Sequence, residues 1–126
     1  MKLNFSWLAG VVMLLIAGPA FSGQAMQMWN CGLEDDVSEA DVEKQASEWL
    51  KAARKLDGGK NLEAMVLFPV AVNATGETDV VFVVTAPSFA EWGRFWDAYP
   101  ASDAFGDDDG EMFCPDSVVW EAMKVK

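Results

Sequence analysis

The chain has 126 residues, of which 52% are hydrophobic, and a formal net charge of −11 from 20 acidic and 9 basic residues. This composition predicts one folded domain and excludes a disordered chain. The absence of histidine excludes Ser-His-Asp hydrolases, histidine-ligated zinc and haem with a proximal histidine, and the acidic surplus argues against nucleic acid and anionic membranes as partners.

Residues 1–25 have the pattern of a secretory signal peptide. Lys2 is the positively charged residue of the N-terminal region, and an apolar stretch follows it. A Gly-Pro pair then ends the helix that this apolar stretch is expected to form. The small residues that come next predict cleavage after Ala25, with Ala20 and Ser22 as alternative cut sites. An uncleaved membrane anchor is the other interpretation, but the apolar stretch is shorter than the roughly 20 residues that span a bilayer.

The remaining residues, 26–126, are expected to form one exported domain that is periplasmic or secreted and has no membrane contact after cleavage. In an oxidising compartment a single pair of cysteines predicts one disulfide, here between Cys31 and Cys114. Two buried thiols are the alternative. The pair does not form a Cys-x-x-Cys redox motif, and two thiolates alone make an incomplete metal site.

The first half of the domain predicts a strand followed by a helix. Residues 26–33 form a short apolar stretch that ends in a polar loop, which favours a strand. Ser38 is a good N-cap residue, and Asp41 occupies the capping-box position. Apolar residues then recur at helical spacing as far as Leu56, and Gly58 and its neighbouring glycine predict the end of this helix.

The second half predicts two strands, a helix and a final strand. Residues 62–72 and 79–85 are rich in apolar and β-branched residues, and Pro69 implies a sheet edge or a bulge. A capping box predicts the start of the second helix. The apolar stripe expected to be buried on this helix consists of Phe89, Trp92, Trp96 and Tyr99, and Phe95 lies to one side of it. Residues 116–126 contain the last strand.

The predicted order is therefore β-α-β-β-α-β, which is typical of a ferredoxin-like α+β fold with a four-stranded antiparallel sheet and two helices on one face. In this topology the last strand lies antiparallel beside the first. The end of the first strand, with Cys31, then meets the start of the last strand, with Cys114 just before it. The predicted fold and the predicted disulfide are thus mutually consistent.

The element order, the Trp29-Asn30 pair and the aromatic second helix FAEWGRFWDAY resemble the dimeric α/β-barrel superfamily, which includes antibiotic-biosynthesis-type monooxygenases, haem-degrading monooxygenases and NIPSNAP-like proteins. The resemblance implies a homodimer whose sheets pair face to face, with a pocket between sheet and helices in each protomer. Haem-degrading members use an asparagine, a tryptophan and a histidine. Asn30 matches the asparagine of these members. The strand that should carry the tryptophan has Phe82 instead, and the chain has no histidine, so no cofactor is expected.

Aromatic residues are the candidates to line such a pocket for a small apolar or aromatic ligand. They are the five tryptophans Trp29, Trp49, Trp92, Trp96 and Trp120, together with Tyr99. The alternative is that these rings pack the core and the dimer interface, because a domain of this size depends on large aromatic side chains. Asn30 is a weak candidate for a catalytic group that positions a substrate.

An acidic cluster in the loop before the last strand is a weak candidate for a calcium site. It contains Asp107, Asp109 and Glu111. An EF-hand template with Gly110 at its sixth position places Phe105 at the first, where a ligand is required, so an EF-hand is not expected. A solvated acidic loop is the alternative interpretation.

Three functions are compatible with these observations. The first is an exported protein that binds a small ligand or is structural, with no specific activity readable from the sequence. The second is a cofactor-independent oxygenase in which Asn30 and the pocket aromatics position the substrate. The third is an acidic interaction module that docks on a basic partner through residues 103–111, and whose binding weakens with salt.

Overall fold

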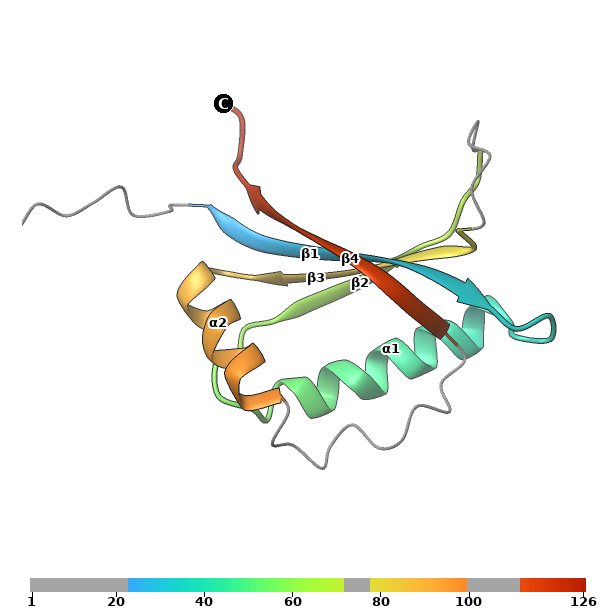
Figure 1. The fold of residues 1–126 in the computed structure, drawn as a ribbon, viewed down its shortest axis with the longest axis horizontal. Coiled ribbons are helices and arrows are strands. Elements are labelled where there is room, and N and C mark those ends of the chain that lie inside the picture. Colours follow the sequence, from blue (N-terminus) through green and yellow to red (C-terminus); the bar gives the residue numbers. More distant parts are fainter. Residues whose placement is uncertain (1–22, 72–77, 100–111) are drawn as a thin grey trace, which may run out of the picture.

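The computed structural model describes residues 23–71, 78–99 and 112–126, and it confirms the ferredoxin-like element order (Figure 1). The elements are β1 (Gln24–Leu33), α1 (Glu39–Ala53), β2 (Glu63–Leu67), β3 (Val80–Ala86), α2 (Phe89–Ala98) and β4 (Met112–Ala122). The strands form one antiparallel sheet in the order β2-β3-β1-β4, and both helices lie on the same side of it (Figure 1).

The sheet has one face toward the helices and one open face, and the strand register assigns residues to each. On β1, Trp29 pairs with Phe82, whereas Met26 pairs with Thr85 on one side and Trp120 on the other. Because side chains alternate along a strand and directly paired residues share a face, Trp29 points to the helices and Met26 to the open face. The open face therefore carries the apolar residues Met26, Met28, Met65, Leu67, Val81, Val83, Val118 and Trp120, and the polar residues Asn30, Glu63, Thr85 and Asp116.

The capping box predicted for α1 is present. The Ser38 side chain accepts a hydrogen bond from the backbone N–H of Asp41, and the Asp41 carboxylate accepts one from the backbone N–H of Ser38 at 3.0 Å. Hydrogen bonds from the hydroxyl and the backbone of Ser38 hold the pKa of Asp41 below its ordinary value, because they favour the charged carboxylate. This contribution to stability is present at neutral pH and is lost as the pH falls through the lowered pKa.

Helix α1 ends earlier than predicted, at Ala53, and a turn follows it. The Arg54 guanidinium donates two hydrogen bonds to the Leu62 carbonyl, at 3.0 and 2.8 Å, which closes the turn. Gly58 has a φ of +74° in this turn, and a Cβ there would collide with the backbone of α2 at Phe95. Glycine is thus required both for the left-handed conformation and for the close approach to α2.

Helix α2 starts as predicted, but it is rotated relative to its predicted buried stripe. Ser88 is the N-cap residue, and its hydroxyl accepts a hydrogen bond from the Glu91 N–H at 3.2 Å. Phe95, expected to one side, is fully buried, whereas Trp92 and Trp96 are partly buried. Phe95 lies at the edge of the predicted stripe, next to Tyr99 on the helix surface, so a rotation of the helix makes it the residue nearest the sheet.

Two strand boundaries differ from the predicted ones for reasons of backbone chemistry. Strand β2 ends at Leu67, two residues before Pro69, although the apolar sequence continues to residue 72. Proline has no N–H to donate, so it cannot extend a regular ladder. Strand β4 starts at Met112 rather than near residue 116, and it contains Cys114 and Pro115 at the edge of the sheet.

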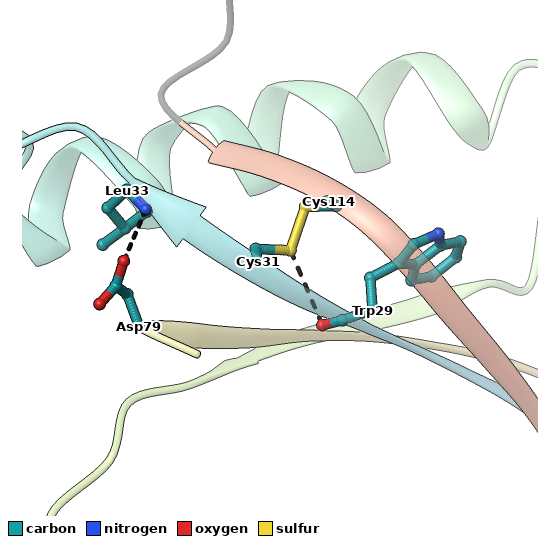
Figure 2. Close-up of a disulfide and its surroundings, with 5 residues drawn as sticks. All are labelled: Trp29, Cys31, Leu33, Asp79 and Cys114. Carbon is teal, nitrogen blue, oxygen red and sulfur yellow. Dashed lines mark hydrogen bonds between the residues drawn. A yellow bond between two sulfur atoms is a disulfide. The ribbon is translucent and has the colours of Figure 1, made fainter. Parts of the chain in front are cut away.

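The predicted disulfide is present and joins β1 to β4 (Figure 2). Cys31 and Cys114 have an S–S distance of 2.07 Å and are 83 residues apart in the sequence. The register shifts between Asn30 and Gly32, so Cys114 and Pro115 together lie opposite Cys31. Two residues opposite one is the arrangement of a β-bulge. Pro115 has no N–H to donate, and its position in the bulge needs no hydrogen bond from it to β1.

Candidate functional site

A cavity of about 450 Å³ lies on the helix face of the sheet, at the end of β1 that carries the disulfide. It is lined by Trp29, Glu34, Trp49, Phe82, Trp96, Tyr99, Met112, Phe113 and Cys114. Its walls come from the sheet and from both helices, so residues far apart in the sequence converge on one space. The volume falls in the range of about 300–1,000 Å³ that small-molecule sites occupy.

Six aromatic residues line the cavity, and the rings of five of them contact one another. The sixth, Phe113, pairs with Gly32 and is 72% exposed. Trp29 stacks on Phe82 with ring centroids 5.6 Å apart, and Trp49 meets the same phenylalanine edge to face at 5.2 Å. Trp96 lies 6.0 Å from Trp29 and 4.9 Å from Tyr99. Mutual contacts of this kind restrict the rotamers of the rings, so the wall is already ordered without a ligand.

Polar atoms contribute a large share of the exposed wall, and two side chains place polar groups at defined points of it. The indole N–H of Trp49 lies 3.5 Å from the Tyr99 hydroxyl and donates to it. Glu34 is exposed at the start of the loop after β1, and its carbonyl accepts a hydrogen bond from the Val37 N–H at 3.1 Å. The site thus combines an aromatic interior with one hydroxyl and one exposed carboxylate.

The backbone beneath the site is held by two further interactions (Figure 2). The Leu33 N–H donates to the Asp79 carboxylate at 2.9 Å, which fixes the end of β1 beside the start of β3. The disulfide fixes the same end of β1 to β4 on the other side. Because both neighbours of β1 are attached here, Trp29 is presented to the cavity from a rigid strand.

Of the predicted pocket residues, the structure brings together Trp29, Trp96 and Tyr99, which all line the cavity. Trp92 does not line it, and its indole N–H donates to the side-chain oxygen Oε1 of Gln27 at 3.1 Å in a separate contact. Trp120 is excluded from it, because Trp120 pairs with Met26 on the open face and is 57% exposed.

Trp49, also among the candidate tryptophans, lines the cavity as well, whereas Phe82 is a lining residue that the sequence analysis did not predict. Trp49 belongs to the apolar stripe of α1, three residues after Ala46 and seven after Val42, which is helical spacing that the sequence shows. Phe82 belongs to a strand in which nearly every residue is apolar, so its direction could not be read from alternation.

Asn30 lies away from the cavity. Its register partners are Val81 on β3 and Asp116 on β4, and it is exposed on the open face. Trp29 and Cys31, its neighbours in the chain, point to the helices instead. The predicted arrangement, in which Asn30 and the pocket aromatics act on one substrate, is therefore not formed within one chain.

The calcium candidates Asp107, Asp109 and Glu111 lie outside the described residues. Within the described residues, no three side chains that could ligate a metal come together. Arg94, the arginine of α2, lies 3.8 Å from the Asp57 carboxylate at the surface. In the same parts of the chain, no helix is both long and apolar enough to cross a membrane.

Comparisons with known proteins identify no family for this chain. The chain matches no protein-family model and no curated protein. Among solved structures it is similar to a mutant chlorite dismutase from Candidatus Nitrospira defluvii, with 14% sequence identity and a TM-score of 0.41. The match covers 83% of this chain but only 42% of that one. Similarity at this level transfers no activity, because one fold hosts many functions.

Proposed function

We propose that this protein is an exported binding protein of the dimeric α/β-barrel type, which holds a small apolar or aromatic molecule in the aromatic cavity. The observation that carries the proposal is the convergence of five mutually contacting aromatic rings from the sheet and both helices on one space of about 450 Å³. A concave, mostly aromatic site with a few placed polar groups is the usual form of a small-molecule site.

Binding accounts for the lining better than catalysis does. Among the described lining residues, the side chains that could act as an acid or a base are those of Glu34 and Tyr99, and the sulfur of Cys114 is joined to that of Cys31 in the disulfide. A nucleophile next to a base is not present among them. The oxygenase alternative depended on Asn30, which is on the open face, and the residues of the acidic interaction alternative, 103–111, lie outside the described parts.

The binding proposal predicts unequal effects for two tryptophans one turn apart on α2. We expect wild-type protein to bind the neutral fluorescent probe N-phenylnaphthylamine, and Trp96→Ala to weaken this binding by about tenfold or more, because a large aromatic contact is lost. Trp92→Ala removes the same ring from outside the cavity and should change the affinity by about twofold or less.

The measurement is a fluorescence titration of both variants, after circular dichroism has shown that each is folded. Equal losses in the two variants would mean that the probe responds to general loosening and would contradict the assignment of the site. An absence of probe binding by the folded wild type would overturn the binding proposal itself.

Export is supported by the disulfide, which is consistent with an extracellular or periplasmic location. For the position of signal cleavage, we propose the bond after Ser22 rather than the bond after Ala25. Strand β1 begins at Gln24, and Ala25 is completely buried, so a cut after Ala25 would remove two residues of a central strand. Ala20 and Ser22 supply the small residues that a signal peptidase requires three and one positions before the cut.

Cleavage after Ser22 is expected to give a mature chain that begins at Gly23. The Gly23 nitrogen lies 3.3 Å from the Glu121 carboxylate, so the new α-ammonium group would meet an opposite charge at the end of β4. The mass of the intact exported protein checks this. A chain beginning at Met26 would contradict the proposal, and one beginning at Phe21 would assign the cut to Ala20 and leave β1 whole.

The dimer that the family resemblance implies is supported by the open face of the sheet. Its large apolar side chains are exposed in a single chain, including Met65 at 46%, Val118 at 50% and Trp120 at 57%. Soluble proteins seldom leave a large contiguous apolar patch in water unless it binds something. We propose that this face pairs with the same face of a second copy, as face-to-face sheets do in the superfamily.

A further inference from the structure

We infer that the aromatic cavity selects an organic cation, such as an aryl- or alkylammonium compound, over neutral and anionic molecules of the same shape. This inference deepens the proposed binding function and rests on it. The inference concerns the charge of the ligand. Neither the hydrophobic character of the rings nor the fold determines that charge.

The first argument is the sign of the charge at the cavity. Among the described residues of the lining, Glu34 carries the formal negative charge, and no lysine or arginine is present. Two arginines near the helices are engaged elsewhere, since Arg54 donates to the Leu62 carbonyl and Arg94 lies beside Asp57. A carboxylate ligand would therefore meet repulsion without a partner, whereas a cation would meet an opposite charge.

The second argument is the electronic character of the wall. The face of an aromatic ring carries negative charge from its quadrupole, and tryptophan binds cations best among the aromatic residues. Three tryptophans line the cavity, one each from β1, α1 and α2: Trp29, Trp49 and Trp96. Because they approach from the sheet and from both helices, a cation inside is near several rings at once, which is the arrangement of an aromatic cage.

The third argument is the position of the carboxylate relative to the rings. Glu34 is exposed, whereas Trp29, Trp49 and Phe82 are partly or fully buried. A cation can thus approach a carboxylate that is still hydrated, and then place its apolar groups against the rings without stripping a buried charge of water. The formal charge of −11 on the whole chain also raises the local concentration of cations around it.

The test uses two probes that differ in charge and hardly in shape. Phenyltrimethylammonium carries a quaternary nitrogen where tert-butylbenzene carries a carbon. Both are titrated against N-phenylnaphthylamine bound to the wild-type protein, and the displacement gives their affinities. We expect the cation to bind at least about tenfold more tightly than the neutral compound, as expected for a cation shielded from water by aromatic rings.

A matched pair of variants tests the carboxylate. Glu34→Gln is expected to weaken phenyltrimethylammonium binding about threefold to fivefold and to leave tert-butylbenzene unchanged, since the carboxylate is exposed and partly screened. Glu48→Gln removes the same charge from α1 at an exposed position outside the lining and should leave both affinities unchanged.

The outcomes separate this inference from the binding proposal. Equal affinities for the two probes would overturn the inference and leave a cavity that binds neutral apolar molecules. Equal effects of the two glutamine variants would overturn the role of Glu34. Failure of N-phenylnaphthylamine itself to bind would overturn the binding proposal, and the inference with it.

Discussion

Replacing both Cys31 and Cys114 with alanine is expected to lower the free energy of unfolding by about 4.5 kcal/mol in the chain-entropy description of a cross-link. The two cysteines are 83 residues apart in the sequence, so the disulfide closes a loop that takes in almost the whole domain. Opening this loop releases a large amount of conformational entropy in the unfolded chain. Small domains commonly have a total stability of about 5–15 kcal/mol, so the loss is a large part of it.

The measurement is chemical denaturation of the variant beside wild-type protein with and without reductant. The single variants separate the cross-link from packing. Cys31 is 1% exposed and Cys114 is partly exposed, so a packing effect would make Cys31→Ala clearly the more harmful of the two. A cross-link effect makes both single variants as unstable as the double variant. A loss below about 1 kcal/mol in the double variant would contradict the entropic account.

Replacing Val118 with aspartate is expected to convert the proposed dimer into monomers and to raise its dissociation constant by at least about 100-fold. Val118 lies on β4 and points to the open face, where it pairs with Met28. A stable dimer buries about 800 Å² on each partner, and a carboxylate placed in an apolar interface loses its hydration without gaining a partner. The expected loss corresponds to about 2.7 kcal/mol.

Val119 supplies the matched control, because it is the next residue and points to the opposite side of the sheet. It pairs with Gln27 and is 40% exposed, against 50% for Val118. Val119→Asp should therefore leave the dimer intact, as sedimentation velocity over a range of concentrations can show. A wild-type protein that stays monomeric at high micromolar concentration would contradict the proposed interface, and so would an equal effect of the two substitutions.

The elements that were predictable from sequence are those specified by local chemistry. Ser38 with Asp41, and Ser88 with Glu91, mark helix starts because a side-chain oxygen can satisfy an N–H that the helix leaves unpaired. The order of elements then restricts the topology to a few choices, and the paired cysteines agree with one of them. The fold and the disulfide followed from these features without any view of the packing.

The candidate site was less predictable, because it depends on which way each side chain points. Strand β3 is apolar at nearly every position, so alternation could not assign Phe82 to the cavity. Trp120 and Asn30 are ordinary strand residues by sequence, and only the register with β1, β3 and β4 places both on the open face. A shift of one residue in register would have exchanged the two faces.

The amino-acid sequence by itself determined the element order, the helix starts and the cysteine pair, because these depend on residues near one another in the chain or on their type. Tertiary structure alone decided the rotation of α2 that buries Phe95, the bulge at Cys31 and the convergence of Trp29, Trp49 and Trp96 on one cavity. Those features are set by the packing of helices against a twisted sheet, where distant side chains compete for the same space.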